Sequence, residues 1–342
     1  MKLSKVLVVL SLVMGLVFMA GNVKAANSMS DNVPGNASFA YFYATPGCIS
    51  TVIQIHNISD DPQCIHIVPF DRCSIPGYDY QFCVSERGTL ILIIDATSDG
   101  YGTITPICDE EEMTAKEMGI SGLSDGTITG YMFISAIDSD GCKAGEICTC
   151  DSPDIDDLVG NNPLIVSTAL VESNWWVGVN AAMVQNLADG EVNTEGYIDS
   201  GTDILNGACV NLYGRWYDDT TTNGNLVLVF PVGAVACTES CDDSACGTDS
   251  GYYITGYSYD ENQNPVSFHK CVEEASMIPF GAIGLPTGGK TSGWIEIDNT
   301  TATAFGFTIM EDGLHCDALP LFKEGTSGQE AGCPACRLPS GE

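Results

Sequence analysis

Apolar and polar side chains alternate over short stretches along most of the chain. In residues 51–56, TVIQIH, Ile53 and Ile55 fall on one face and Gln54 and His56 fall on the other. A period of two is typical of a β-strand with one buried face. The same pattern recurs in residues 64–68, 90–94, 128–134, 164–171, 226–230, 252–257, 294–297 and 304–309. Gly, Asn, Asp and Pro lie between these stretches, so we predict strands joined by turns.

Helical periodicity is nearly absent from the sequence. Only residues 110–118, EEEMTAKEM, have a composition that suits a short helix. Many short strands separated by turn residues are typical of β-sandwiches. We therefore predict an all-β fold with two tandem β-sandwich modules, Ig-like or jelly-roll-like, whose loops are stapled by disulfides.

Two distant stretches share a Cys-Val step, QFCVSERG at 81–88 and HKCVEEAS at 269–276. Upstream of these steps, Asp71 is followed five residues later by a proline, and so is Asp260. A gap of one residue then aligns the two Cys-Val steps. This similarity predicts a tandem repeat of one β-module, with chance similarity between β-strands as the alternative.

A second pair of segments extends the alignment and sets the expected boundaries. DGTITGYMFIS resembles GGKTSGWIEI, which places Gly130-Tyr131 against Gly293-Trp294. We predict module 1 over residues 27–190, module 2 over 191–317 and a Cys-containing tail over 318–342. Module 1 should carry an insertion near 96–124 and a Cys-rich loop at 142–157.

The N-terminus has the pattern of a secretory signal peptide, predicted to span residues 1–26. Lys2 and Lys5 precede an apolar run over residues 6–20, and small residues follow at a cleavage-like site. A membrane anchor is the alternative, but the run is shorter than the roughly 20 residues that span a bilayer. We expect a periplasmic, cell-surface or extracellular protein with no membrane span after removal of the signal.

The charge balance is strongly acidic. The 342 residues include 45 Asp and Glu against 12 Lys and Arg, a formal net charge of −33. Such a surface repels nucleic acid and anionic lipid. The expected partners are other surface or extracellular proteins, or further copies of the chain.

The 16 cysteines are even in number, and in an exported protein they predict disulfides. Sequence does not fix their pairing. The disulfide candidates are Cys48, Cys64, Cys73, Cys83, Cys108, Cys142, Cys148, Cys150, Cys209, Cys237, Cys241, Cys246, Cys271, Cys316, Cys333 and Cys336. Cys83 and Cys271 occupy matching places in the proposed repeat and should form equivalent bonds. For the tail, a zinc site of His315, Cys316, Cys333 and Cys336 is the alternative to disulfides.

Two histidines and two acidic residues are the candidate metal ligands. If residues 57–65 turn the chain back into a hairpin, His56 lies opposite His66, and the two imidazoles then suit zinc, copper or nickel. Asp138 and Asp140 form part of a calcium-like loop. Two ordinary polar residues and a solvated acidic loop are the respective alternatives. No cofactor is required by the sequence, and calcium is the one it leaves open.

The remaining motifs give little support for an enzyme. Residues 284–291, GLPTGGKT, match the phosphate-loop pattern, but an alternating strand-like segment follows where a helix is needed, so we predict a turn. No nucleophile elbow or zinc-protease helix is present. Trp175 and Trp176 are candidate binding residues, because an exposed indole stacks on a sugar or a partner.

Several segments, GCISTVIQIHNIS, IHIVPFDRCSIPGYDYQF, GYMFISAID and GVNAAMVQ, resemble a group of uncharacterised exported bacterial β-rich proteins with IQIHN…FYD…YDFD-like strands. The resemblance covers most of residues 40–310 and implies an exported β-rich protein without an assigned activity. We therefore predict an exported, non-enzymatic structural, adhesive or surface-assembly protein. The alternatives are a calcium- or carbohydrate-binding module, and an extracellular metal-binding or redox protein that uses its Cys and His clusters.

Overall fold

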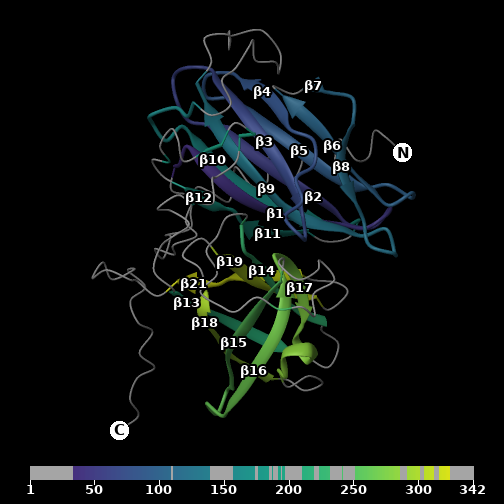
Figure 1. Ribbon diagram of the computed structural model, residues 1–342, viewed down its shortest axis with the longest axis vertical. Coiled ribbons are helices and arrows are strands. Elements are labelled where there is room, and N and C mark those ends of the chain that lie inside the picture. The colour runs from purple at the N-terminus through teal and green to yellow at the C-terminus, as the bar shows by residue number, and fades with distance from the viewer. Residues whose placement is uncertain are drawn as a thin grey trace.

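The fold is almost entirely β, and the prediction of two tandem β-sandwiches is confirmed (Figure 1). The computed structural model describes residues 34–108, 111–138, 157–173, 176–184, 187, 192–193, 195–196, 210–218, 223–231, 241, 251–285, 291–300, 304–311 and 316–323. Within these ranges a single short 3₁₀-helix, η1 (Phe280–Ile283), accompanies the strands. Among the residues described, no helix is long and apolar enough to cross a membrane.

The first sandwich consists of two antiparallel sheets. The five-stranded sheet has the order β12-β1-β9-β3-β4, with β12 (Ala182–Val184), β1 (Ala37–Ala44), β9 (Ile128–Ile137), β3 (Gln63–Asp71) and β4 (Tyr80–Val84). The seven-stranded sheet runs β11-β10-β2-β5-β6-β7, with β8 also paired to β6. Its strands are β11 (Trp176–Asn180), β10 (Leu164–Val171), β2 (Ser50–Asn57), β5 (Thr89–Ala96), β6 (Tyr101–Cys108), β7 (Glu111–Glu112) and β8 (Lys116–Ser121).

The second sandwich also consists of two sheets. The five-stranded sheet has the order β16-β15-β18-β13-β21, with β16 (Pro265–Glu273), β15 (Gly251–Asp260), β18 (Thr291–Thr300), β13 (Val210–Asp218) and β21 (Phe322–Lys323). The four-stranded sheet has the order β17-β14-β19-β20, with β17 (Ala275–Pro279), β14 (Asn223–Val229), β19 (Phe305–Glu311) and β20 (Cys316–Pro320).

Strand order is the same in both sandwiches once β6, β7 and β8 are set aside. The strands β1 to β5 and β9 to β12 match β13 to β21 in chain order and in neighbours. The register matches as well: Phe70 lies opposite Tyr131 in the first sandwich, and Tyr259 lies opposite Trp294 in the second. These are the positions that the sequence alignment sets against each other. The three extra strands span residues 101–121, inside the expected insertion.

The two sandwiches share an apolar interface in addition to their own cores. The outer face of β1, β3 and β9 packs against the outer face of β14 and β19, in one continuous apolar cluster. Tyr41 meets Phe307 edge to face, with ring centroids 5.6 Å apart. At the rim of this interface, Arg72 pairs with Glu273 and its carbonyl accepts the N–H of Ala275 at 3.1 Å. Figure 1 shows the junction between the first sandwich and β14, β17 and β19.

Three expectations about the chain are corrected or refined by these elements. The described part of the expected helix, residues 111–118, contains strands instead: β7 and β8 pair with β6, and Met118 and Ile120 are buried and alternate with exposed residues. The tail does not begin at residue 318, because β20 and β21 pair with β19 and β13 beyond that point. Of the phosphate-loop pattern, Gly284 follows η1 and Thr291 begins β18, and residues 286–290 lie outside the described residues.

Candidate functional site

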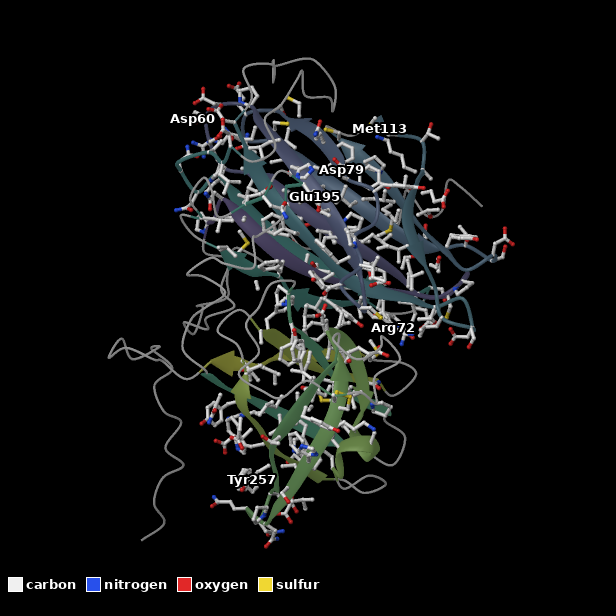
Figure 2. All side chains as sticks on the ribbon, viewed as in Figure 1. Asp60, Arg72, Asp79, Met113, Glu195 and Tyr257 are labelled. Carbon is white, nitrogen blue, oxygen red and sulfur yellow. A yellow bond between two sulfur atoms is a disulfide. The ribbon has the colours of Figure 1, made fainter. Side chains whose placement is uncertain are left out.

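The five-stranded sheet of the second sandwich has one face that carries exposed aromatic rings. Leu212, Ile254 and Ile295 point into the core, and the residues that alternate with them point away from it. We call this surface the outer aromatic face. It consists of Asn211, Tyr213, Arg215, Tyr253, Thr255, Tyr257, Tyr259, His269, Trp294, Glu296 and Asp298. In Figure 2, Tyr257 lies at the end of the second sandwich remote from the first.

Strand register arranges the centre of the face in two rows. Trp294 on β18 lies between Arg215 and Tyr259, and Glu296 on the same strand lies between Tyr213 and Tyr257. The Arg215 guanidinium stacks over the Trp294 ring at 4.5 Å from its centroid. The Trp294 side chain is nevertheless 45% exposed and Tyr257 is 42% exposed. Large rings with this exposure in adjacent positions are unusual on a solvated surface.

A hydrogen-bonded carboxylate lies among the rings. The Tyr213 hydroxyl donates to Glu296 Oε1 at 3.0 Å, and Asn211 Nδ2 donates to the same oxygen at 3.3 Å. Partial burial and the neighbouring charge of Glu296 raise the pKa of Asp298. The same two causes, in the same order, raise the pKa of Tyr259. The face therefore combines apolar rings with fixed hydrogen-bond acceptors and donors.

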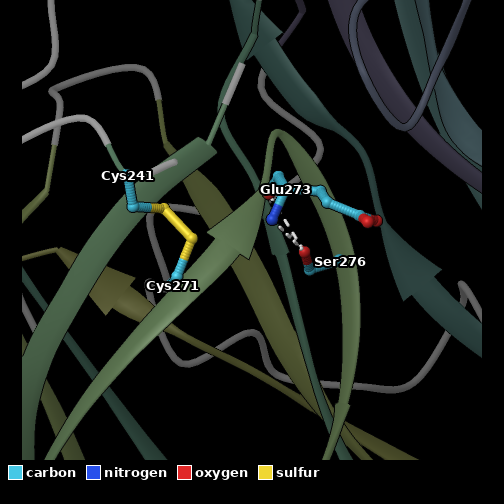
Figure 3. Close-up of a disulfide and its surroundings, with 4 residues drawn as sticks. All are labelled: Cys241, Cys271, Glu273 and Ser276. Atoms are coloured by element: carbon cyan, nitrogen blue, oxygen red, sulfur yellow. Dashed lines mark hydrogen bonds between the residues drawn. A yellow bond between two sulfur atoms is a disulfide. The ribbon is translucent and has the colours of Figure 1, made fainter. Parts of the chain in front are cut away.

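The face continues to the edge strand β16. The Tyr253 and His269 rings stack with centroids 4.4 Å apart and an angle of 19° between their planes. With Lys270 and Cys271 they line a shallow hollow of about 380 Å³. Cys271 is bonded to Cys241, which joins the segment before β15 to β16 (Figure 3). This disulfide fixes the edge of the sheet on which the face lies.

The matching face of the first sandwich has a different environment. There Tyr41, Tyr131 and Phe70 form one row, and Phe39, Phe133 and Val68 form the next. All six are buried, at 3% exposure or less, in the interface with β14 and β19. One face of the fold thus occurs twice in the chain, covered by protein in the first sandwich and open in the second.

A second hollow lies between the sandwiches. Its volume is about 570 Å³, and Tyr43, Asp125 and Thr127 from the first sandwich face Glu273 and Ser276 from the second. The Ser276 hydroxyl accepts the N–H of Glu273 at 2.8 Å and donates to the carbonyl of the same residue at 3.0 Å (Figure 3). These bonds fix the bend from β16 into β17.

A buried carboxyl group, Glu274, occupies that bend. Burial raises its pKa to about 8. The Tyr252 hydroxyl donates to Oε1 at 3.4 Å, which opposes the shift, and the charge of Asp71 adds to it. Glu274 Oε2 is buried and has no hydrogen-bond partner among the described residues. Because this pKa lies above neutral, the buried side chain is mostly protonated at pH 7.

The hairpin that was expected to join the two histidines is absent. His56 lies on β2, which pairs with β5 and β10, whereas His66 lies on β3 in the opposite sheet, between β4 and β9. His56 Nδ1 shares a hydrogen bond with Thr89 Oγ1 at 2.8 Å. His66 Nε2 lies 3.5 Å from an oxygen of Asp79. The prediction that His56 and His66 lie opposite each other is wrong, because the chain crosses between sheets after β2.

Burial lowers the pKa of both histidines.

Asp138 follows β9, and its N–H donates to the Asp157 carbonyl at 2.8 Å. Asp140 lies outside the described residues. Among the residues that are described, no three His, Cys, Asp or Glu side chains are grouped as metal ligands. The structure therefore does not bring His56 and His66 together, and the predicted Asp138–Asp140 site lies partly outside the described residues.

Of the two predicted tryptophans, Trp175 lies outside the described residues. Trp176 opens the edge strand β11 and is 38% exposed. The outer aromatic face carries a different tryptophan, Trp294, with tyrosines from β13 and β15. The sequence pattern that could have revealed this face is the placement of Tyr253, Tyr257 and Tyr259 at alternate positions. The sequence alone does not tell whether these rings lie in the core or on the surface.

Six of the described cysteines are disulfide-bonded, as expected. Beside the bond of Cys241 to Cys271, four further cysteines are disulfide-bonded: Cys64, Cys73, Cys83 and Cys108. Cys48 Sγ donates a hydrogen bond to Glu172 Oε1 at 3.4 Å. Cys83 and Cys271 are thus both oxidised, on matching strands. Cys142, Cys148, Cys150, Cys209, Cys237, Cys246, Cys333 and Cys336 lie outside the described residues. So does His315, and of the four residues of the proposed zinc site only Cys316, which begins β20, lies within them.

Comparison of the chain with protein-family models, with curated proteins and with solved structures found no match in any of the three. The function of the chain is therefore inferred from the chemistry and geometry of its two matching sheet faces.

Proposed function

We propose that this chain is an exported, non-enzymatic adhesive protein that holds a surface or extracellular partner on the outer aromatic face of its second sandwich. The signal-like N-terminus supports export. Five cysteines on the strands and turns of the sandwiches, Cys64, Cys73, Cys83, Cys108 and Cys271, are oxidised, which favours a compartment outside the reducing cytoplasm.

The observation that carries the proposal is the contrast between the two matching faces. In the first sandwich the face is a protein interface, and in the second the same positions carry the exposed Tyr257 and Trp294 beside the half-buried Tyr259. Exposed Tyr, Trp and Arg side chains are enriched in surfaces that bind partners. A surface with no partner gains nothing from large exposed rings in adjacent rows.

The shared strand order supports a further part of the proposal, namely that the chain arose by duplication of a nine-strand sandwich. The two sandwiches share their strand order and register, and a turn that begins at an aspartate, Asp71 or Asp260, occurs at the same place in each. Unrelated sandwiches seldom share all three features. Both aspartates close their turns through the side chain: Asp71 Oδ1 accepts the N–H of Ile75, and Asp260 Oδ1 accepts the N–H of Asn264. Duplication gives one copy a covered face and the other a face free to bind.

The test is retention of the purified chain on washed cells of the producing organism. The double variant Trp294→Ala/Tyr257→Ala removes both exposed rings, and Tyr101→Ala, at an equally exposed tyrosine of the first sandwich, serves as the control. We expect the double variant to lose at least about tenfold in retained protein, since each hot-spot ring contributes about 1–2 kcal/mol. The control should be retained as the unaltered chain is. Equal retention of all three proteins, with unchanged circular dichroism, contradicts the proposal.

A further inference from the structure

We infer that the ligand of the outer aromatic face is a neutral glycan, bound as an extended chain across β13, β18 and β15. This inference rests on the proposed function and names the chemistry of its partner.

The face presents the two kinds of contact that a sugar needs. A pyranose has C–H groups on the faces of its ring and hydroxyls around its rim. Trp294 and Tyr257 offer exposed rings for the C–H faces. Glu296 and Asp298 offer acceptors for hydroxyls beside them, and the Asn211 amide, which donates to Glu296, holds that carboxylate in place. Because rings and polar groups alternate within the same rows, one sugar can meet both.

The covered face in the first sandwich shows how the same positions look when the partner is a protein sheet. Phe133 stands there where the open face has Glu296, and Phe70 and Phe39 stand where it has Tyr259 and Tyr213. Covering Glu296 with an apolar sheet costs several kcal/mol, because the charge loses its water. A hydroxyl-rich ligand replaces that water with hydrogen bonds. The polar residues of the open face therefore favour a sugar over a protein sheet.

The acidic charge of the chain and of the face disfavours anionic ligands and so favours a neutral glycan. The formal net charge of the chain is −33, and the centre of the face carries Glu296 and Asp298 against the single cation of Arg215, itself stacked on Trp294. A nucleic acid, an anionic lipid or an acidic polysaccharide is repelled by this field. A neutral polysaccharide is not.

The extent of the face fits a chain rather than a single sugar. The rows run from β13 across β18 to β15, and neighbouring strands are about 4.8 Å apart, so the residues used span about 10 Å or more. Arg215 and Trp294 in one row and Tyr257 in the other are exposed, and Tyr259, Tyr213 and Glu296 beside them are half-buried. We therefore expect affinity to rise with the number of sugar units until the rows are covered.

The experiment measures binding of the full chain to insoluble cellulose, chitin and mannan by sedimentation, and to their soluble oligosaccharides by calorimetry. We expect at least one of these glycans to bind with an affinity that is independent of salt between 50 and 500 mM, since no ion pair is formed. Trp294→Ala and Tyr257→Ala should each weaken binding by at least about tenfold, and Glu296→Gln by about threefold to tenfold. Tyr257→Phe, which keeps the ring, and Tyr101→Ala, the remote control, should stay within about twofold.

Three outcomes overturn the inference. The first is that none of the glycans binds to a folded chain, and the second is that binding occurs but survives Trp294→Ala and Tyr257→Ala together. In the third, the chain binds polylysine in a salt-dependent manner and binds no glycan. The partner of the face is then a basic polypeptide. If cell retention still depends on Trp294 and Tyr257 in these cases, the proposed adhesive function stands and only the glycan is wrong. If it does not, both fail.

Discussion

At the scale of single residues, two strand positions have room only for glycine. Gly130 on β9 and Gly293 on β18 occupy matching register positions, opposite Asp71 and Asp260. A Cβ at Gly130 would overlap the carbonyl oxygen of Phe70, and one at Gly293 would overlap the carbonyl oxygen of Tyr259. The strands approach closely there because each glycine lacks a side chain.

Gly130→Ala is therefore expected to destabilise the fold by about 1–3 kcal/mol, because the paired strands must separate. Urea unfolding followed by circular dichroism measures the change. Gly160→Ala is the matched control, since no atom lies within 4 Å of the added Cβ. Equal stability of the two variants contradicts the close approach described for β9 and β3.

Glu274 gives the molecule a pH-dependent stability. Its pKa is raised from 4.5 to about 8 in the folded chain, so the folded form keeps a proton that the unfolded form has lost. The stabilising contribution is complete below about pH 4.5 and is lost as the pH rises to about 8. From pH 5 to 8.5 the free energy of unfolding should fall by roughly 3 kcal/mol from this group.

Glu274→Gln should remove that fall, because an amide does not ionise. Unfolding by urea across this pH range measures it, with Glu261→Gln on an exposed turn as the control. A fall of the same size in Glu274→Gln and in the unaltered chain assigns the pH dependence to other groups.

At the scale of elements, alternation predicts strands best where one face is buried. All nine stretches with period two overlap strands. The strand β1, ASFAYFYA, has no alternation because both of its faces are buried, one in the core and one in the interface between the sandwiches. The pairing of β2 with β3 was inferred from proximity in the sequence, and it fails because β2 and β3 are interior strands of opposite sheets.

The outer aromatic face illustrates the same limit. Tyr213, Tyr257 and Trp294 alternate with core residues, and their rings suit either side of a sheet. Which side is open depends on whether another sheet covers it, and that is decided by contacts between distant segments. The two turns at Asp71 and Asp260 could be predicted from the sequence, because each is closed locally by its own aspartate side chain.

The disulfide between Cys241 and Cys271 links the segment before β15 to β16 in the second sandwich. It closes a loop with a sequence separation of 30 residues. In the chain-entropy account a loop of this length adds about 3–4 kcal/mol. The double variant Cys241→Ser/Cys271→Ser should lose about that much in guanidinium unfolding, while keeping the circular dichroism of a β protein. No loss of stability means that the unfolded chain is constrained by other contacts.

At the scale of the whole molecule, the interface between the sandwiches makes the chain one cooperative body. Phe39, Tyr41 and Phe133 from the first sandwich and Val227 and Phe307 from the second belong to one apolar cluster. Two domains linked by so large an apolar contact are expected to unfold together.

Phe307→Ala is expected to lower stability by about 3–5 kcal/mol and to split calorimetric unfolding into two transitions, because the ring that meets Tyr41 is lost. The unaltered chain should give one transition. Val266→Ala, at a side chain that is 42% exposed, is the control and should change little. Two transitions in the unaltered chain contradict a cooperative interface.

The central claim is that the second sandwich binds its partner through the face that its twin keeps covered. Hydroxyl-radical footprinting of the full chain, alone and on washed cells, tests it most directly, because it reads the exposure of each side chain. We predict that oxidation of Trp294 and Tyr257 falls several-fold on the cells while that of Tyr101 stays constant. Unchanged oxidation of Trp294 and Tyr257 in cell-bound protein would contradict the account.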